Sequence, residues 1–436
     1  MAAHDDTPDA GAGEPTETAE LRLEPIRFMA RVDAVLRFGE LMLGAGASSA
    51  RVRDSMERIA HALGLDHLEC RVGMTDIVMS AHRGAIYRTR VAEVGHIAVD
   101  AGRITELRRL VHDVADGVSV LVLQRELDRI EGMPPRYPIA LRVAAAALAC
   151  AAFALLNNGG WAEAVAVALA VAVGQWVRIL LVRARVNEFL LVFVAAVVAL
   201  LGYLAVMAAL DAAGLETGDH DAAITSAVLF LVPGFPLVTG AMDLARRDLH
   251  AGIARIVYAS LVLLATGTAV WAVAAAFRFS PIATAPVLVD EPLLSALRLV
   301  AGFVGVLGFA ILFSTPWRIA LTASVIGAIA NVARLALIDH DVSPAVAAAA
   351  AGLAVGIAAF VVSRWVRSPR VALTVPGVII MVPGAAAYRS IVATIDGDTV
   401  AAVQNGVQAV FVVVALTIGL TVARILTERE WQQSER

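Results

Sequence analysis

The sequence contains no lysine, and it has little cysteine and little charge. Charged residues make up 17% of the 436 positions, so this is not the composition of an ordinary soluble protein. All 35 basic residues are arginines, a bias from which no mechanism follows. The two cysteines, Cys70 and Cys150, fall in different parts of the chain, so we expect neither a disulfide nor a cysteine metal site.

The sequence instead contains many long apolar runs. Hydrophobic residues make up 59% of the chain and the mean hydropathy is +0.76, which predicts a polytopic α-helical membrane protein. The net charge of -4 gives no indication of a nucleic-acid partner. Residues 1–25 are acidic and small and lack the features of a signal peptide, so we expect a disordered tail there.

The stretch 26–135 has the pattern of a soluble, cytoplasmic α+β domain. Helices are predicted over 27–43 and from Ser48 or Ser49 to Leu63, with Gly64 as the terminating glycine. Strand-like runs follow at 67–72, 76–82 and 86–94, then helices at 104–116 and 119–130, and a Gly/Pro linker at 132–135. No elbow, metal or phosphate motif frames the serines and histidines of this stretch. We therefore expect no enzyme, no cofactor and no metal site.

From residue 136 onward, apolar segments of about 20 residues predict ten membrane spans. The first half, 136–278, would hold spans at 138–157, 161–182, 187–210, 222–243 and 252–277. The second half, 279–425, would hold spans at 293–313, 316–336, 342–363, 371–391 and 401–424, followed by a cytoplasmic tail at 426–436. Arginines gather in alternate connections, such as Arg183, Arg246 and Arg364. This asymmetry predicts that both termini are cytoplasmic, with the chain in the plasma or inner membrane.

The fourth span of each half is interrupted by proline and glycine. The breaks are Val232-Pro233-Gly234-Phe235-Pro236 and Val382-Pro383-Gly384, although a Val-Pro-Gly at 375–377 leaves the position of the second break open. Five spans per half mean that the second half enters from the opposite side, so we expect a 5+5 inverted repeat. Recurring breaks of this kind indicate a transporter substrate site. The alternative is a pair of packing kinks whose recurrence is coincidental.

Asp243 follows the first break, near the inner end of its span. A carboxylate at this depth is costly unless it is paired or hydrated, so it is a candidate for proton coupling or for neutralising a substrate amine. The alternative is an interfacial residue paired with Arg246 or Arg247. Half-helix N-termini at the breaks would favour an anionic group, and a carboxylate would favour an ammonium group. A small zwitterion fits both, which ranks amino acids above sugars or lipids.

Several uncharged polar residues are further candidates for a substrate site. Asn331 lies three residues from Arg334, and the pair could bind a carboxylate, or Arg334 could reach the outer interface. Tyr388 follows the second break. Gln404 and Gln408 lie four apart at the start of the last span, where they could line a cavity or bond to neighbouring helices.

These motifs, in this order, resemble the threonine/serine exporter family. The resemblance is carried by Gly44–Val52 and Ala62–Leu65, by the first break with Asp243 and Gly252–Arg255, and by the second break through Tyr388-Arg389. It implies secondary export of threonine and serine driven by the proton motive force, and some two-component relatives are associated with dicarboxylates. The functional candidates carried over from the family are Pro233, Gly234, Pro236, Asp243, Pro383, Gly384 and Tyr388.

The sequence thus predicts a proton-coupled exporter of small amino acids whose partners are the substrate, the proton, the lipid bilayer and a second copy in a homo-oligomer. No nucleotide-binding motif is present, so we expect no direct use of ATP. Three alternatives stay open: a dicarboxylate exporter, a membrane-anchored hydrolase using Ser48 or Ser49, and a scaffold or sensor whose soluble domain binds a partner.

Overall fold

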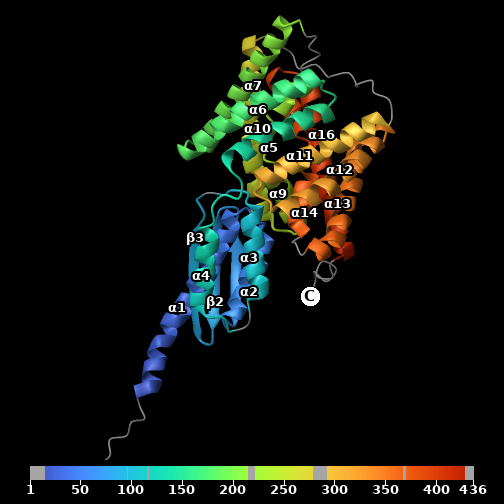
Figure 1. The fold of residues 1–436 in the computed structure, drawn as a ribbon. Coiled ribbons are helices and arrows are strands. Elements are labelled where there is room, and N and C mark those ends of the chain that lie inside the picture. The colour runs from blue at the N-terminus through green and yellow to red at the C-terminus, as the bar shows by residue number, and fades with distance from the viewer. Residues whose placement is uncertain are drawn as a thin grey trace, which may run out of the picture.

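The computed structural model describes residues 15–95, 97–114, 117–214, 221–277, 292–366 and 370–427. The chain forms an N-terminal unit beneath a larger bundle of helices (Figure 1). The N-terminal unit consists of α1 (Pro15–Gly44), α2 (Ser49–Ala62), β1 (His67–Val72), β2 (Asp76–Arg83), β3 (Ile86–Glu93), α3 (Ala101–Asp113) and α4 (Val120–Glu131). Its strands pair antiparallel in the order β1-β2-β3.

The N-terminal unit has an apolar core of its own. The strand β2 alternates inward and outward residues, and its Ile77 and Met79 are fully buried. They belong to a cluster with Met56 of α2 and Leu107 of α3, which is separate from the cluster of the helical bundle. Gly64 follows the C-cap of α2 and adopts a left-handed backbone conformation, with a φ of 73°. This is the conformation expected of a glycine that terminates a helix.

The helical bundle contains the apolar segments. Its long helices are α5 (Ile139–Leu156), α6 (Trp161–Arg183), α7 (Glu188–Ala212), α10 (Leu249–Phe277), α11 (Leu293–Leu312), α12 (Trp317–Asp339), α13 (Pro344–Val366) and α16 (Thr399–Thr427). Among the described residues these eight are long and apolar enough to cross a membrane, and they coincide with eight of the ten expected spans. The chain is therefore a multi-pass helical membrane protein.

The other two expected spans, 222–243 and 371–391, are not continuous helices. The first is divided into α8 (Asp221–Ala227), the short 3-10 helix η1 (Leu229–Leu231) and α9 (Gly234–Ala245). The second is divided into α14 (Arg370–Val378), η2 (Ile379–Met381) and α15 (Gly384–Ile395). The α14 and α15 segments are bent by 45°, and counting them as one broken span raises the number of candidate spans to 9.

A proline lies at each break, Pro233 in the first segment and Pro383 in the second. Pro376, by contrast, does not interrupt its helix. That residue lies inside α14, whereas the second break falls at Val382–Gly384. The two segments take the same path, since Pro233 has φ -80° and ψ 57° and Pro383 has φ -79° and ψ 55°. In each case the glycine amide donates to the carbonyl oxygen two residues earlier at 2.8 Å.

The ends of the chain differ in part from the expectation. The helix α1 begins at Pro15, so residues 15–25 are helical and not a disordered tail. Glutamate, alanine and leucine in this stretch favour a helix, and α1 projects away from the sheet (Figure 1). Residues 1–14, the loop 278–291 and the tail 428–436 lie outside the described residues. The N-terminal unit and the end of α16 lie at the same end of the bundle.

Glycines allow neighbouring helices to approach closely, and Gly419 between α16 and α13 is the tightest case. A methyl carbon in Gly419→Ala would lie 2.1 Å from the backbone oxygen of Ala349. Because backbone must then move, we expect a loss of about 1–3 kcal/mol of stability. The control is Gly202→Ala, whose new carbon would lie 3.5 Å from Ala170 Cα, an ordinary contact. Unfolding in detergent measures both, and equal stability of the two variants would contradict the close approach.

Candidate functional site

The two broken segments pack against each other at the centre of the bundle. A carbon added at Gly234 would lie 2.6 Å from Ile379 Cδ1, and one added at Gly384 would lie 3.2 Å from Leu229 Cδ1. Each glycine therefore lets the 3-10 turn of the opposite segment come close. The reciprocal contacts extend to the flanking helices, because α9 contacts α16 and α10 contacts α15. The breaks that the sequence singled out are thus brought together.

Each break also starts a helix whose first amides have no partner within that helix. The helix α15 begins Gly384-Ala385-Ala386, whereas α9 begins Gly234-Phe235-Pro236 and has one amide fewer, because proline carries no N–H. The positive ends of both helices lie at the crossing, as an anion-binding role requires. The N-terminus of α15 therefore offers more backbone N–H donors to an anion than the N-terminus of α9 does.

A small enclosed cavity lies at this crossing. Its wall includes Val232, Gly384 and Tyr388 from the breaks, together with Thr225 of α8 and Thr266 of α10. The volume is about 10 Å³, which is room for about one water molecule, so the crossing is closed in this structure. Thr225 is 4% exposed, and its hydroxyl oxygen has no hydrogen-bond partner. A buried hydroxyl of this kind indicates a place where water or a ligand group binds.

Asp243 lies nine residues beyond Gly234, toward the C-terminal end of α9. Its carboxylate is 1% exposed and pairs with the Nε of Arg255, at 3.5 Å, which is 5% exposed. The partner is therefore neither Arg246 nor Arg247, the two arginines expected from the sequence. Arg255 belongs to the stretch that resembles the family, but the sequence did not indicate that it pairs with Asp243. Its position in α10, antiparallel to α9, brings it back beside Asp243.

Arg255 also connects the helical bundle to the N-terminal unit. Its guanidinium donates to the carbonyl oxygen of Ala47 at 2.8 Å and to the hydroxyl of Thr239 at 3.1 Å. The backbone of Ser49, the first residue of α2, acts electrostatically on the Asp243 carboxylate. The loop between α1 and α2 thus closes over a buried ion pair.

Two further contacts to the second half come from the N-terminal unit and from the linker that follows it. The amide of Ala101, at the start of α3, donates to the carbonyl oxygen of Phe313 at 2.9 Å. The hydroxyl of Tyr137 donates to the carbonyl oxygen of Thr315 at 2.7 Å. The N-terminal unit and its linker therefore contact the turn between α11 and α12 as well as the region of Asp243 and Arg255.

Three other candidates lie away from the crossing. Asn331 is 1% exposed, and its side-chain oxygen accepts a hydrogen bond from Arg334 Nε at 3.1 Å, so the pair is joined within α12. Gln404 and Gln408 are exposed on α16 and do not line the cavity between the breaks. Their spacing correctly placed them on one face, but the sequence does not tell which face of α16 points inward.

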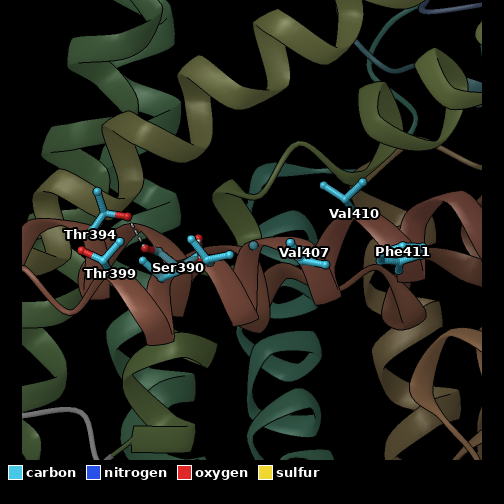
Figure 2. Close-up of a pocket in the computed structure, with 9 residues that line it drawn as sticks. Ser390, Thr394, Thr399, Val407, Val410 and Phe411 are labelled. Carbon is cyan, nitrogen blue, oxygen red and sulfur yellow. Dashed lines mark hydrogen bonds between the residues drawn. The ribbon is translucent and has the colours of Figure 1, made fainter.

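The exposed face of α16 carries a larger groove, which Figure 2 shows. It measures about 580 Å³ and lies between α15 and α16, lined by Ser390, Thr394, Thr399, Val407 and Phe411 among others. Apolar residues dominate, and Val410 and Phe411 are 63% and 61% exposed. In a multi-pass membrane protein such a face contacts lipid. The groove is therefore distinct from the enclosed crossing.

The serines of the hydrolase alternative do not form a nucleophilic site. Ser49 is fully buried, and its hydroxyl lies 3.3 Å from the carbonyl oxygen of Gly73, to which it donates. Ser48 occupies the N-cap position of α2, without a side-chain capping bond. Burial raises the pKa of the Cys70 thiol to about 11, so that thiol is not an activated nucleophile either.

A multi-pass helical protein whose two broken segments cross at its centre belongs to the class of membrane transporters. Within that class, the chain belongs to the threonine/serine exporter family. The family model ThrE, described as "Putative threonine/serine exporter", matches residues 33–277. A second model, described as "Threonine/Serine exporter, ThrE", matches residues 298–426. The resemblance stated from the sequence is confirmed.

Individual relatives agree with the family but name two kinds of cargo. A threonine/serine exporter of Corynebacterium glutamicum is 25% identical over 411 residues, covering 91% of this chain and 81% of that protein. The "Probable succinate transporter subunit YjjP" of Klebsiella aerogenes is 32% identical over 233 residues, covering 52% of this chain and 85% of that protein. No solved structure matches the chain.

Proposed function

We propose that this protein exports small hydroxy amino acids, threonine and serine, across the plasma or inner membrane in exchange for protons. The observation that carries the proposal is the crossing of the two Pro-Gly breaks, in a chain similar along most of its length to a threonine/serine exporter. Thr225, Thr266 and Tyr388 offer hydroxyl groups there that suit a hydroxylated substrate. The first amides of α15 suit its carboxylate.

We further propose that the two membrane halves form a 5+5 inverted repeat, residues 136–278 and 279–425, with both termini in the cytoplasm. The matched dihedral angles of Pro233 and Pro383 support this arrangement. So does the equal length of α10 and α16, each of 29 residues. In such a repeat the halves rock against each other around a fixed site. The small cavity at the crossing would then be the occluded form of that site.

The N-terminal unit, residues 26–135, is proposed to be the inner gate. It bonds to Arg255 of α10 through Ala47 and to the α11–α12 turn through Ala101, and the backbone of Ser49 acts on Asp243 of α9. If the two halves rock against each other, these contacts must either break or move together with the halves. Asp243 is the candidate for proton coupling, because protonating it would weaken its pair with Arg255 and release the loop that covers it.

The test is movement of labelled threonine and serine in proteoliposomes, with and without an imposed pH gradient. The native chain is compared with Asp243→Asn and with Asp339→Asn, a control at an exposed ion pair with Arg298. We expect gradient-dependent movement that only Asp243→Asn abolishes. Movement kept in Asp243→Asn would remove the coupling role, and no movement of either amino acid by the folded native protein would contradict the substrate assignment.

A dicarboxylate is the second candidate cargo, favoured by the similarity to the succinate transporter subunit. The same vesicles test it, because excess unlabelled succinate would compete with labelled threonine only if both bind at one site. An additional carboxylate requires an additional cation in that site. The residues lining the cavity at the crossing include no arginine, which favours the zwitterion.

A further inference from the structure

Two threonines supply hydroxyl groups to a cavity that is otherwise mainly apolar. Thr225 comes from α8 and Thr266 from α10, and both line the small cavity at the crossing. Much of the remaining wall consists of aliphatic side chains: Val228, Leu229, Val232 and Leu263. Because the cavity has room for about one water molecule, a single group placed in it can reach both hydroxyls. Apolar surroundings strengthen the hydrogen bonds that such a group forms.

The two hydroxyls differ in the hydrogen bonds that they still have to offer. Thr266 donates to the carbonyl oxygen of Val262, one turn earlier in α10, at 2.9 Å, so its oxygen is left to accept. Thr225 is 4% exposed, and its hydroxyl has no hydrogen-bond partner among the described residues. It can therefore donate. A group between the two threonines meets a donor on one side and an acceptor on the other.

A hydroxyl group is the chemical match for this pair. It accepts a hydrogen bond from Thr225 and donates its own proton to the oxygen of Thr266. A hydrogen atom or a methyl group in its place would leave the buried Thr225 hydroxyl unsatisfied, which costs free energy. The oxygen of an ionised carboxylate could accept from Thr225, but it has no proton to donate to Thr266. The pair thus favours a hydroxyl over an alkyl group and over a carboxylate.

The equivalent positions of the second half are apolar. The elements η1 and η2, α9 and α15, and α10 and α16 each begin and end 150 residues apart. With that offset Thr225, four residues before η1, corresponds to Val375, four residues before η2, and Thr266 corresponds to Leu416. Val375 and Leu416 are each 1% exposed. Packing around a broken segment therefore does not require hydroxyl groups at these positions, which supports a ligand-binding role for the two threonines.

We propose that Thr225 and Thr266 bind the side-chain hydroxyl of the transported amino acid and so determine the preference for serine and threonine over alkyl amino acids. This assignment rests on the proposed function and names the residues that would set its specificity. Gly384, the first residue of α15, lines the same cavity. A substrate carboxylate at the start of α15 would therefore bring the nearby side-chain hydroxyl to the threonines. The aliphatic wall suits the methyl group of threonine.

The test compares labelled threonine with labelled 2-aminobutyrate, which is threonine without its hydroxyl group. Movement of each compound into proteoliposomes that contain the full-length protein is measured over a range of concentrations. We expect the native protein to prefer threonine by at least about tenfold, because a site that pairs with a substrate hydroxyl rejects the analogue that lacks it.

Three variants separate recognition from a structural role. Thr225→Val should reduce the preference for threonine to within about twofold, whereas Thr225→Ser keeps the hydroxyl and should keep the preference. The matched control is Thr268→Val, because Thr268 is exposed two residues beyond Thr266 and donates to the Leu264 carbonyl oxygen at 2.9 Å. It should behave as the native protein does. Thr225→Val should unfold at no lower temperature than the native protein, so a lost preference would not reflect misfolding.

The outcomes distinguish this assignment from the proposed function. A preference that is lost in Thr225→Val and kept in Thr225→Ser and Thr268→Val supports the assignment. Equal movement of threonine and 2-aminobutyrate by the native protein overturns it but leaves export of threonine standing. An unchanged preference in Thr225→Val also overturns it, and the cavity then holds only a structural water molecule. If the folded native protein moves neither compound, the proposed function itself is contradicted, and the assignment falls with it.

Discussion

Replacing Arg255 with glutamine is expected to destabilise the folded protein by about 3–5 kcal/mol. The reason is that Asp243, at 1% exposure, would be left without its partner and would have to hold an unpaired charge or take up a proton. The substitution also removes donors from the Ala47 carbonyl oxygen and the Thr239 hydroxyl, both of which are buried with it. The free energy of unfolding in detergent, from denaturant titration, measures the loss.

Two comparisons show whether the ion pair is responsible for that loss. Arg298→Gln breaks the pair with Asp339, whose side chain is 46% exposed, and should cost at most about 1 kcal/mol. The double variant Asp243→Asn/Arg255→Gln removes both charges and should recover part of the stability. If Arg255→Gln costs no more than Arg298→Gln, the buried pair does not stabilise the C-terminal end of α9.

Loss of Arg255 should also loosen the N-terminal unit. Its guanidinium is bonded to the Ala47 carbonyl oxygen in the loop between α1 and α2. We expect faster proteolysis of the linker near residue 135 in Arg255→Gln than in Arg298→Gln, because the unit would separate more often from the bundle.

The second large effect is expected at the crossing, where Gly384→Leu should reduce export by at least about tenfold. A carbon added at Gly384 already lies 3.2 Å from Leu229 Cδ1 and 3.5 Å from the side chain of Val232. The larger side chain would fill the cavity bordered by Thr225 and Tyr388, and overpacking of this kind costs about 1–3 kcal/mol. Export of labelled threonine from vesicles, normalised to the amount of folded protein, gives the result.

Graded variants make that result specific. Gly384→Ala needs a shift of a few tenths of an ångström and should keep most of the export. Gly234→Leu, at the reciprocal position, should lose export as Gly384→Leu does, because it presses on Ile379 of the other segment. Full export by either leucine variant in folded protein would mean that the crossing is not the substrate path.

Local patterns in the sequence predicted much of the fold. Both breaks were identified, since proline and glycine interrupt a helix wherever they occur in such a segment. The strand β1 was expected over the residues that form it, and β2 and β3 differ by one residue at one end. Hydrophobic length predicted eight of the spans as continuous helices. In each case the signal lies within a few neighbouring residues.

The position of the second break was less certain, because Pro376 and Pro383 both follow valine and precede glycine. The structure keeps Pro376 inside α14, where Gly377 lies against α12: a carbon added at Gly327 would lie 2.5 Å from the Gly377 carbonyl oxygen. The helix thus continues through Pro376, where it packs closely against α12, and ends before Pro383.

By itself, the sequence determined where the backbone is helical, extended or broken, and which segments are apolar enough for a membrane. Those properties depend on φ and ψ preferences and on hydrophobicity, which act over short distances along the chain. Only the tertiary structure decided that Asp243 pairs with Arg255, that Gln404 and Gln408 face outward, and that the two breaks meet. A helix exposes side chains all around its axis, and which of them becomes buried depends on the other helices that pack against it.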